Sequence, residues 1–174
     1  TAEELYQFAY YVNDTTRTNI KDPLCAKLTA DIVVNKNVLT STETLNEDAS
    51  NFIRWEPIQY FGGTFDGQGH SISGLYFYDM QYYENVGLFG SINSYDFDVW
   101  KGTDTTTIKD LTLKDSYFEA MENVAGIAGQ ITRLVIVFEN VHNEALVKAG
   151  QYAGGLVGRT EYNGYPVVLN SSNK

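Results

Sequence analysis

Aromatic side chains are the residues of this 174-residue chain best suited to bind a ligand. The flat rings of Trp and Tyr can stack on sugar rings while their N–H and O–H groups form hydrogen bonds. An aromatic platform would draw on Trp55, Tyr60, Phe61, Tyr82, Tyr83, Tyr95 and Trp100, and all of these except Phe61 are our candidate ligand-binding residues. Aromatic residues at alternate strand positions more often fill a core, so core packing is the competing interpretation.

Metal binding is the second chemistry that the residue types suggest. Asp96, Asp98 and Asp104 lie close together in the sequence, as calcium ligands do. An EF-hand loop counted from Asp96 requires glycine at its sixth position and glutamate at its twelfth, where this chain has Lys101 and Thr107. The sequence therefore predicts a solvated loop here, with no metal and no cofactor.

Catalytic residue types are present but scattered. The histidines, His70 and His142, are far apart in the sequence, and we expect His70 to stabilise a turn. Cleavage of a polysaccharide would require paired carboxylates, or a calcium cluster with a basic residue beside it. No arginine lies in such a pattern; the ones considered are Arg17, Arg54, Arg133 and Arg159. We therefore expect no catalytic residue and no enzymatic activity.

The charge balance argues against two classes of partner. The chain has 22 acidic and 12 basic residues, which give a formal net charge of -10. Nucleic acids and anionic membrane surfaces require clustered Lys and Arg, so neither is expected as a partner. No apolar stretch approaches the ~20 residues of a membrane-spanning helix. The single cysteine, Cys25, leaves the redox compartment undecided.

Any such site must be positioned by the repeat of this chain, a short glycine-containing sequence that occurs three times and that we call the glycine phrase. It lies at residues 85–90, 124–129 and 153–158, and each copy contains a glycine, two apolar residues and a second glycine. The repeat glycines are Gly87, Gly90, Gly126, Gly129, Gly155 and Gly158. Their first members are 39 and 29 residues apart, which indicates a period of about 30 with one insertion. The pattern is typical of stacked strands with glycine where a Cβ would clash with a neighbour.

One helix is expected, at residues 1–13. Thr1 and Glu4 form a capping-box pattern, and apolar residues recur at helical spacing from Leu5 to Val12. Such a helix can cover the end of a β-core. The rest of the chain is expected to be all-β, since its Tyr, Thr and Val favour strands and its Gly and Asn favour turns.

Strands are expected at residues 25–35, on both sides of a turn at 66–69, and at 108–113, 134–138 and 166–169. Ile72, Leu75 and Phe77 should face the core. Asn140 and Asn170 occupy similar places in two repeats, so their amides either stack along the array or cap separate turns. We expect one domain, with a helical cap and loop at 1–24, β-layers at 25–174, and excursions at about 37–58 and 93–107. The incomplete pattern at 165–174 suggests a piece of a longer chain.

The assembled motifs resemble the GLUG-motif repeat regions of bacterial secreted and surface proteins. The resemblance rests on residues 63–76, on Val-Gly-Leu-Phe-Gly at 86–90, and on Gly-Leu-Val-Gly at 155–158; residues 2–13 and 26–32 are similar to the segment that precedes such repeats. It implies a right-handed parallel β-helix, or β-solenoid, on the exterior of a bacterium. It implies no catalytic residue, because immunoglobulin A peptidases with these repeats have their metal site in another domain and this chain lacks His-Glu-x-x-His.

Three functions follow as hypotheses. The first is a non-catalytic repeat module of an exported bacterial surface protein, serving as an adhesive stalk or spacer. The alternative is a carbohydrate-binding module that uses exposed aromatic residues, and a polysaccharide-cleaving β-helix enzyme is the least favoured. The expected partner is a host or cell-wall glycan or protein. An uncovered last layer would also permit end-to-end self-association.

Overall fold

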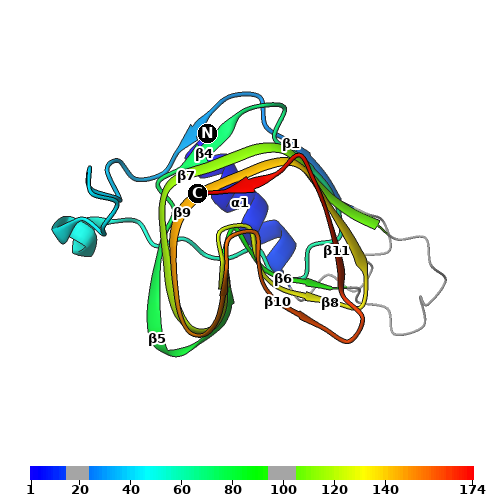
Figure 1. The fold of residues 1–174 in the computed structure, drawn as a ribbon. Coiled ribbons are helices and arrows are strands. Elements are labelled where there is room, and N and C mark those ends of the chain that lie inside the picture. Colours follow the sequence, from blue (N-terminus) through cyan, green and yellow to red (C-terminus); the bar gives the residue numbers. More distant parts are fainter. Residues whose placement is uncertain (15–23, 94–104) are drawn as a thin grey trace.

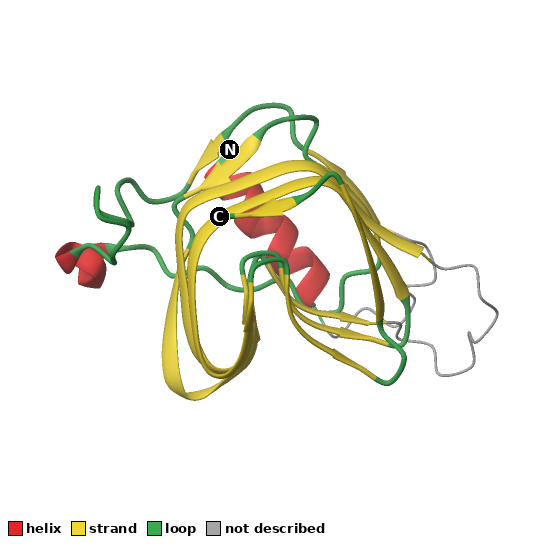
Figure 2. Ribbon diagram, viewed as in Figure 1, coloured by secondary structure: helices red, strands yellow, loops and turns green. Residues whose placement is uncertain are grey.

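The chain folds into parallel β-strands with one α-helix at the N-terminus, as expected of an all-β protein (Figures 1 and 2). The computed structural model describes residues 1–14, 24–93 and 105–174. Helix α1 spans Ala2–Asn13 and the 3-10 helix η1 spans Glu47–Asn51. The strands are β1 (Leu24–Lys27), β2 (Ile32–Val33), β3 (Gly63–Asp66), β4 (Ser71–Ser73), β5 (Tyr76–Val86), β6 (Phe89–Asn93), β7 (Thr105–Ala125), β8 (Ala128–Thr132), β9 (Val135–Gly154), β10 (Val157–Glu161), β11 (Tyr165–Leu169) and β12 (Ser172–Asn173).

Parallel pairing at recurring sequence offsets arranges the strands in five layers. Strand β7 pairs with β9, and β9 with β11, so that Val135 lies in register between Thr105 and Tyr165. Strands β6, β8 and β10 pair at the same spacings as the glycine phrases. We number the layers by their residues: layer 1 is 24–61, layer 2 is 63–93, layer 3 is 105–132, layer 4 is 135–161 and layer 5 is 165–174. The expected strand at 25–35 is divided between β1 and β2, which pair with β3 and β4.

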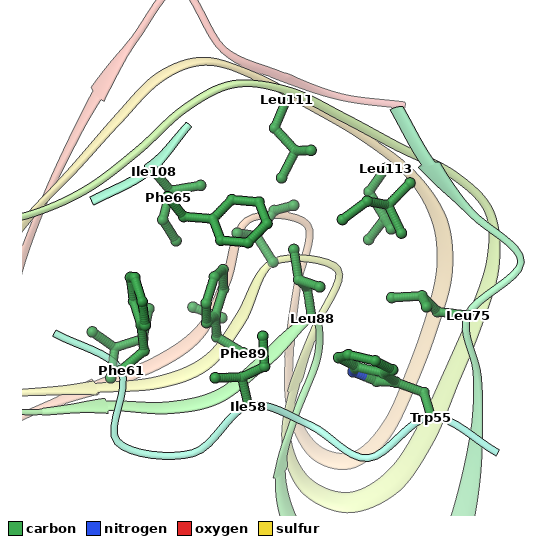
Figure 3. Packing of buried hydrophobic residues seen from close by; sticks show 14 of the residues in the cluster. Trp55, Ile58, Phe61, Phe65, Leu75, Leu88, Phe89, Ile108, Leu111 and Leu113 are labelled. Atoms are coloured by element: carbon green, nitrogen blue, oxygen red, sulfur yellow. The ribbon is translucent and has the colours of Figure 1, made fainter. Parts of the chain in front are cut away.

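The core consists of side chains that stack from layer to layer (Figure 3). One inward column contains, in order of layers, Ala26, Phe65, Ile108, Phe138 and Val168. The prediction for Ile72, Leu75 and Phe77 is confirmed, since none of the three has exposed surface. Repeated burial of apolar groups at one register fixes the pairing, because a slip of one residue would turn these side chains outward.

Helix α1 packs against the core at its layer 1 end. The Thr1 side chain accepts a hydrogen bond from the Glu4 N–H at 3.3 Å, and the Glu4 carboxylate reaches back to the N-terminal amine at 2.9 Å. The predicted capping box is therefore confirmed. The buried face of the helix is Leu5, Ala9 and Val12. Beside it, the Phe8 ring lies 6.3 Å from the ring of Phe61, so the helix contacts layer 1 directly.

A lobe extends from layers 2, 3 and 4 but not from layer 1. It is formed by β5 and the matching halves of β7 and β9, and in Figure 1 it is the U-shaped bend beside the label β5. In layer 1 the N–H of Trp55 bonds to the Tyr76 carbonyl and the N–H of Ile58 bonds to the Leu88 carbonyl. Three steps along layer 1 therefore match twelve steps along layer 2, and layer 1 crosses the neck of the lobe.

The glycine phrases form the bends at the base of the lobe. A Cβ on Gly129 would lie 2.5 Å from the backbone nitrogen of Val86, and a Cβ on Gly126 would overlap the side-chain amide of Asn143. Neither glycine has a positive φ. The close approach of other atoms, as predicted, is therefore what requires glycine at these positions.

Asparagine side chains do connect layers, but not through the predicted pair. Asn140 donates a hydrogen bond from Nδ2 to Oδ1 of Asp110, 2.8 Å away in layer 3. The amide pair across layers 4 and 5 is instead Asn143 with Asn173, at 2.7 Å. Asn140 and Asn170 share a positive φ, of 53° and 47°, so each also accommodates its own turn.

Residues 36–52, which we call the strap, run along the flank of the stack. The N–H of Leu39 donates to Asp115 of layer 3 at 2.8 Å, and Nζ of Lys174 in layer 5 lies 2.7 Å from the Glu43 carboxylate. Residues 53–61 lie back in layer 1, where Ile58 bridges Phe89. The other expected excursion falls largely on residues 94–104, outside the described residues.

Candidate functional site

Trp55 was expected on the ligand-binding platform, and the structure corrects this. Its side chain has no exposed surface, and its indole N–H donates to the Gly87 carbonyl at 3.0 Å. Its ring contacts Tyr6 of helix α1 edge-on at 5.2 Å. Figure 3 shows the indole beside Leu75 and Leu88. Trp55 closes the neck of the lobe on the layer 1 side, so it cannot stack on a ligand.

The other candidate aromatic residues are in different environments. Tyr82 is 86% exposed and Tyr60 is 40% exposed, whereas Tyr83 is half-buried. Tyr95 and Trp100 lie outside the described residues. Among the described candidates, Tyr82 and Tyr83 share one strand, β5 of the lobe, but only the Tyr82 ring is exposed there, because the Tyr83 ring packs against Phe77.

Tyr83 belongs to a group of five side chains that we call the Arg54 cluster: Arg54, Glu56, Phe77, Asp79 and Tyr83. The Arg54 guanidinium carbon lies 4.4 Å from the ring centre of Phe77 and 5.0 Å from that of Tyr83. One guanidinium nitrogen is 3.5 Å from the Asp79 carboxylate, and the Tyr83 hydroxyl donates to Glu56 at 3.0 Å. Layer 1 supplies Arg54 and Glu56, and layer 2 supplies the rest, so the cluster joins the two layers where the lobe begins.

The electrostatics of the Arg54 cluster order the turn that carries Tyr82. Burial, and then the hydrogen bond to Glu56, raise the pKa of Tyr83, so its hydroxyl remains a donor at neutral pH. Hydrogen bonds from the N–H groups of Gln81 and Tyr82 lower the pKa of Asp79. An ionised Asp79 therefore holds residues 79–82 in place, and Tyr82 projects from an ordered turn. Tyr82 bonds to this cluster through its backbone N–H, and its exposed ring is available to stack on a ligand such as a sugar.

Sequence reasoning missed the pairing of Arg54 with Asp79. The two residues are 25 positions apart and belong to different layers, and no motif relates them. The strap intervenes before Arg54, and layer 1 contains no glycine phrase to set its register. The crossing from Trp55 to Ile58, three steps along the chain, brings Arg54 over β5.

A second polar group lies on the outer face of β7. The hydroxyl of Tyr117 donates to the Glu119 carboxylate, the ring stacks on Tyr76 at 6.2 Å, and the Lys148 amine lies 5.5 Å from the ring centre. Tyr117 is only 2% exposed, and burial, followed by the bond to Glu119, raises its pKa. The phenol is thus a neutral, satisfied donor that packs layers together and has little surface for a ligand.

The two histidines lie in separate places. His70 occupies a turn, where its N–H donates to the Gly67 carbonyl and its ring nitrogen Nδ1 is 3.4 Å from Asp31. His142 Nδ1 lies 2.8 Å from the Ser172 hydroxyl on the exposed outer face. In the described part of the chain no carboxylate bonds to the other nitrogen of His142. The serine and histidine are therefore not assembled as in a hydrolytic triad.

Residues 1–14, 24–93 and 105–174 contain no group of three or more His, Cys, Asp or Glu side chains placed to hold a metal ion. Cys25 is an exposed free thiol. No helix in the same residues has the length and apolar character needed to cross a bilayer.

Comparison with known proteins gives one similarity. The chain is 29% identical over 144 residues, 79% of its length, to a protein named halomucin from Haloquadratum walsbyi (strain DSM 16790 / HBSQ001). The similar region is only 1% of the length of halomucin. No protein-family model matches the chain. No solved structure matches it either.

Proposed function

We propose that the chain is a non-catalytic right-handed parallel β-helix module that acts as a stiff stalk or spacer in an exported cell-surface protein. The observation that carries the proposal is the parallel pairing from β7 through β9 to β11 at a recurring sequence offset. Crossovers between parallel strands are right-handed in almost all proteins, which supports the hand. The described residues contain no assembled catalytic group, which is compatible with a mechanical role.

The packing supports stiffness. Strands in adjacent layers are separated by about 4.8 Å, so five layers extend roughly 20 Å. The core columns continue through the layers, and the strap ties layer 1 to Asp115 and Lys174. The similarity to a small part of halomucin supports a place in a much longer protein. The GLUG-like motifs support the same setting outside the cell.

The spacer proposal predicts a constant distance between layer 1 and layer 5. Cys25, the only cysteine, is exposed in layer 1 and can carry one dye, and a cysteine substituted for Ser172 in layer 5 can carry the other. Single-molecule energy transfer should give one narrow distance distribution that does not change with salt. A broad or salt-dependent distribution at pH 7 would refute a stiff spacer. The variant with Ser172 unchanged, labelled only at Cys25, controls for dye behaviour.

Carbohydrate binding is the second candidate, favoured by Tyr82 on the ordered turn of the Arg54 cluster. A glycan array tests it with the wild type, Tyr82→Ala and Tyr162→Ala. Tyr162 is also exposed, at 69%, but lies in the connection between layers 4 and 5 and contacts Arg133, so it is the matched control. Saturable binding that only Tyr82→Ala abolishes would establish a glycan-binding module. An array on which no glycan binds would leave only the spacer.

A further inference from the structure

Three residues with a positive φ form a column at the base of the lobe. Asn85 of layer 2, Asn123 of layer 3 and Tyr152 of layer 4 each immediately precede a residue that pairs in register between the layers. Their φ values are 62°, 53° and 59°. Asparagine tolerates this left-handed region because its short side chain can bond locally, whereas a bulky tyrosine is strained there. The column therefore favours asparagine, which two of these three layers have.

The two asparagines of this column begin an amide ladder. Nδ2 of Asn123 donates to Oδ1 of Asn85 at 2.8 Å. The Asn123 side chain is only 2% exposed, and its Oδ1 is buried with no hydrogen-bond partner among the described residues. Because Nδ2 of this amide points to layer 2, its oxygen faces layer 4, where Tyr152 has no amide to donate. A buried carbonyl oxygen without a partner costs stability.

Tyr152 thus carries two costs at one position, a strained backbone and an unpaired amide in the layer below. The contact that its ring makes is a weak compensation. The guanidinium carbon of Arg159 lies 4.5 Å from the ring centre, but the ring is 50% exposed, and cation–π contacts at exposed sites contribute little. Departures from local preference that packing does not compensate concentrate at functional sites.

Two other tyrosines with a positive φ lack the second cost. Tyr60 and Tyr162 have φ values of 57° and 45°, but neither lies in a column of stacked asparagines. The ring of Tyr162 also contacts an arginine, since the guanidinium carbon of Arg133 lies 5.4 Å from its centre. Tyr162 therefore resembles Tyr152 in everything except the unpaired amide.

The polar side chains beside the Tyr152 ring are held in place. Nη2 of Arg159 lies 2.5 Å from one carboxylate oxygen of Glu161, and Nε2 of Gln130 donates to the other oxygen at 3.1 Å. The side chains of Arg159 and Glu161 are 34% and 25% exposed, so both keep surface for a ligand. They lie on the face of β8 and β10 opposite to the buried Ile131. All these residues belong to layers 3 and 4, so the group involves no part of layer 5.

We propose that Tyr152, Arg159 and Glu161 form a binding site for a neutral sugar ring. The sugar stacks on the exposed ring of Tyr152, the guanidinium donates to its hydroxyl oxygens and the carboxylate accepts from its hydroxyl groups. An anionic sugar is disfavoured, because the ion pair is neutral and the whole chain has a formal net charge of -10. The inference depends neither on the spacer function nor on the surface around Tyr82, which lies on the turn of layer 2.

The variant Tyr152→Asn separates loss of the site from loss of the fold. It removes the ring, suits the positive φ and supplies an amide to pair with Asn123. The urea midpoint of unfolding, followed by circular dichroism, should therefore rise by roughly 0.5 M. The same variant should bind sugar less well although it is more stable. Tyr152→Phe, which keeps the ring, should bind like the wild type.

Saturation-transfer NMR measures the binding. The neutral probes are cellohexaose, mannohexaose and chitohexaose, and a hyaluronan hexasaccharide is the anionic probe. At least one neutral probe should bind saturably to the wild type, and its affinity should fall about 10-fold in Tyr152→Asn but not in Tyr162→Ala or Tyr82→Ala.

Four outcomes would each overturn the proposal. They are no saturable binding of any neutral probe, a preference for the anionic probe, unchanged affinity in Tyr152→Asn, and a lower urea midpoint for that variant. Binding that is lost in Tyr82→Ala and kept in Tyr152→Asn would place the sugar at the Arg54 cluster, so the two sites are distinguished.

Discussion

Replacement of Trp55 by alanine should be among the most destabilising single changes in this protein. The side chain has no exposed surface, and it crosses the neck of the lobe between helix α1 and the side chains of Leu75 and Leu88. Truncation of a buried Trp to Ala costs about 3–5 kcal/mol, from lost transfer energy and the cavity left behind. Trp55→Phe keeps most of the ring but leaves the Gly87 carbonyl without the indole N–H, at a cost of about 1–3 kcal/mol.

Urea unfolding followed by circular dichroism measures these losses for a chain whose total stability is of the order of 5–15 kcal/mol. The melting temperature should fall by roughly 2–4 °C for each kcal/mol in a domain of this size. Tyr82→Ala is the control, because this exposed aromatic residue should change the free energy of unfolding by about 0.5 kcal/mol or less. A loss below about 1 kcal/mol for Trp55→Ala would refute the buried placement, and with it the crossing of the lobe by layer 1.

Three further outcomes are expected. Gly126→Ala should destabilise the fold by about 1–3 kcal/mol because its Cβ overlaps an amide, whereas Gly62→Ala, which has open space and no positive φ, should be nearly neutral in the same urea titration. Burial raises the pKa of Tyr6 to about 12, so stability present below pH ~10 should decline between pH 10 and 12. Tyr6→Phe should make that decline shallower in pH-dependent melts without removing it, because the raised pKa values of Tyr83 and Tyr117 contribute in the same direction. Burial opposes ionisation of Asp66, but hydrogen bonds from the Gln68 N–H and the Lys109 amine lower its pKa; stability should therefore fall as pH drops below about 4, and less steeply in Asp66→Asn.

The parts of the fold that could be predicted from the sequence are those with local or periodic signals. The capping box at Thr1 and Glu4 predicts a helix because both partners lie within one turn. The glycine phrases predict the register of β6, β8 and β10 because the same close approach recurs in each of these layers. Alternation around Ile72 predicts the buried face of the strands that follow.

The environment of Trp55 could not be predicted, because it depends on how two segments without a common period meet. Layer 1 crosses the lobe in three steps, from Trp55 to Ile58, and so contains no glycine phrase. The polar residues around this crossing resemble a loop in the sequence. The contact of Glu43 with Lys174 spans 131 positions and has no sequence signal. The Arg54 cluster could not be predicted for the same reason, since its residues come from two segments, layer 1 and layer 2, that meet at that crossing.

The direction of the hydrogen bonds determines how this protein responds to mechanical tension. The hydrogen bonds between layers are directed along the axis of the stack, because each strand bonds to the strands above and below it. Pulling the two ends apart therefore strains one ladder at a time, and the layers should peel off successively at modest force. Each released layer of about 30 residues lengthens the chain by roughly 100 Å. The strap connects layer 1 to layers 3 and 5, so its contacts must break early. The protein should therefore unfold under load in steps, each of which dissipates mechanical work.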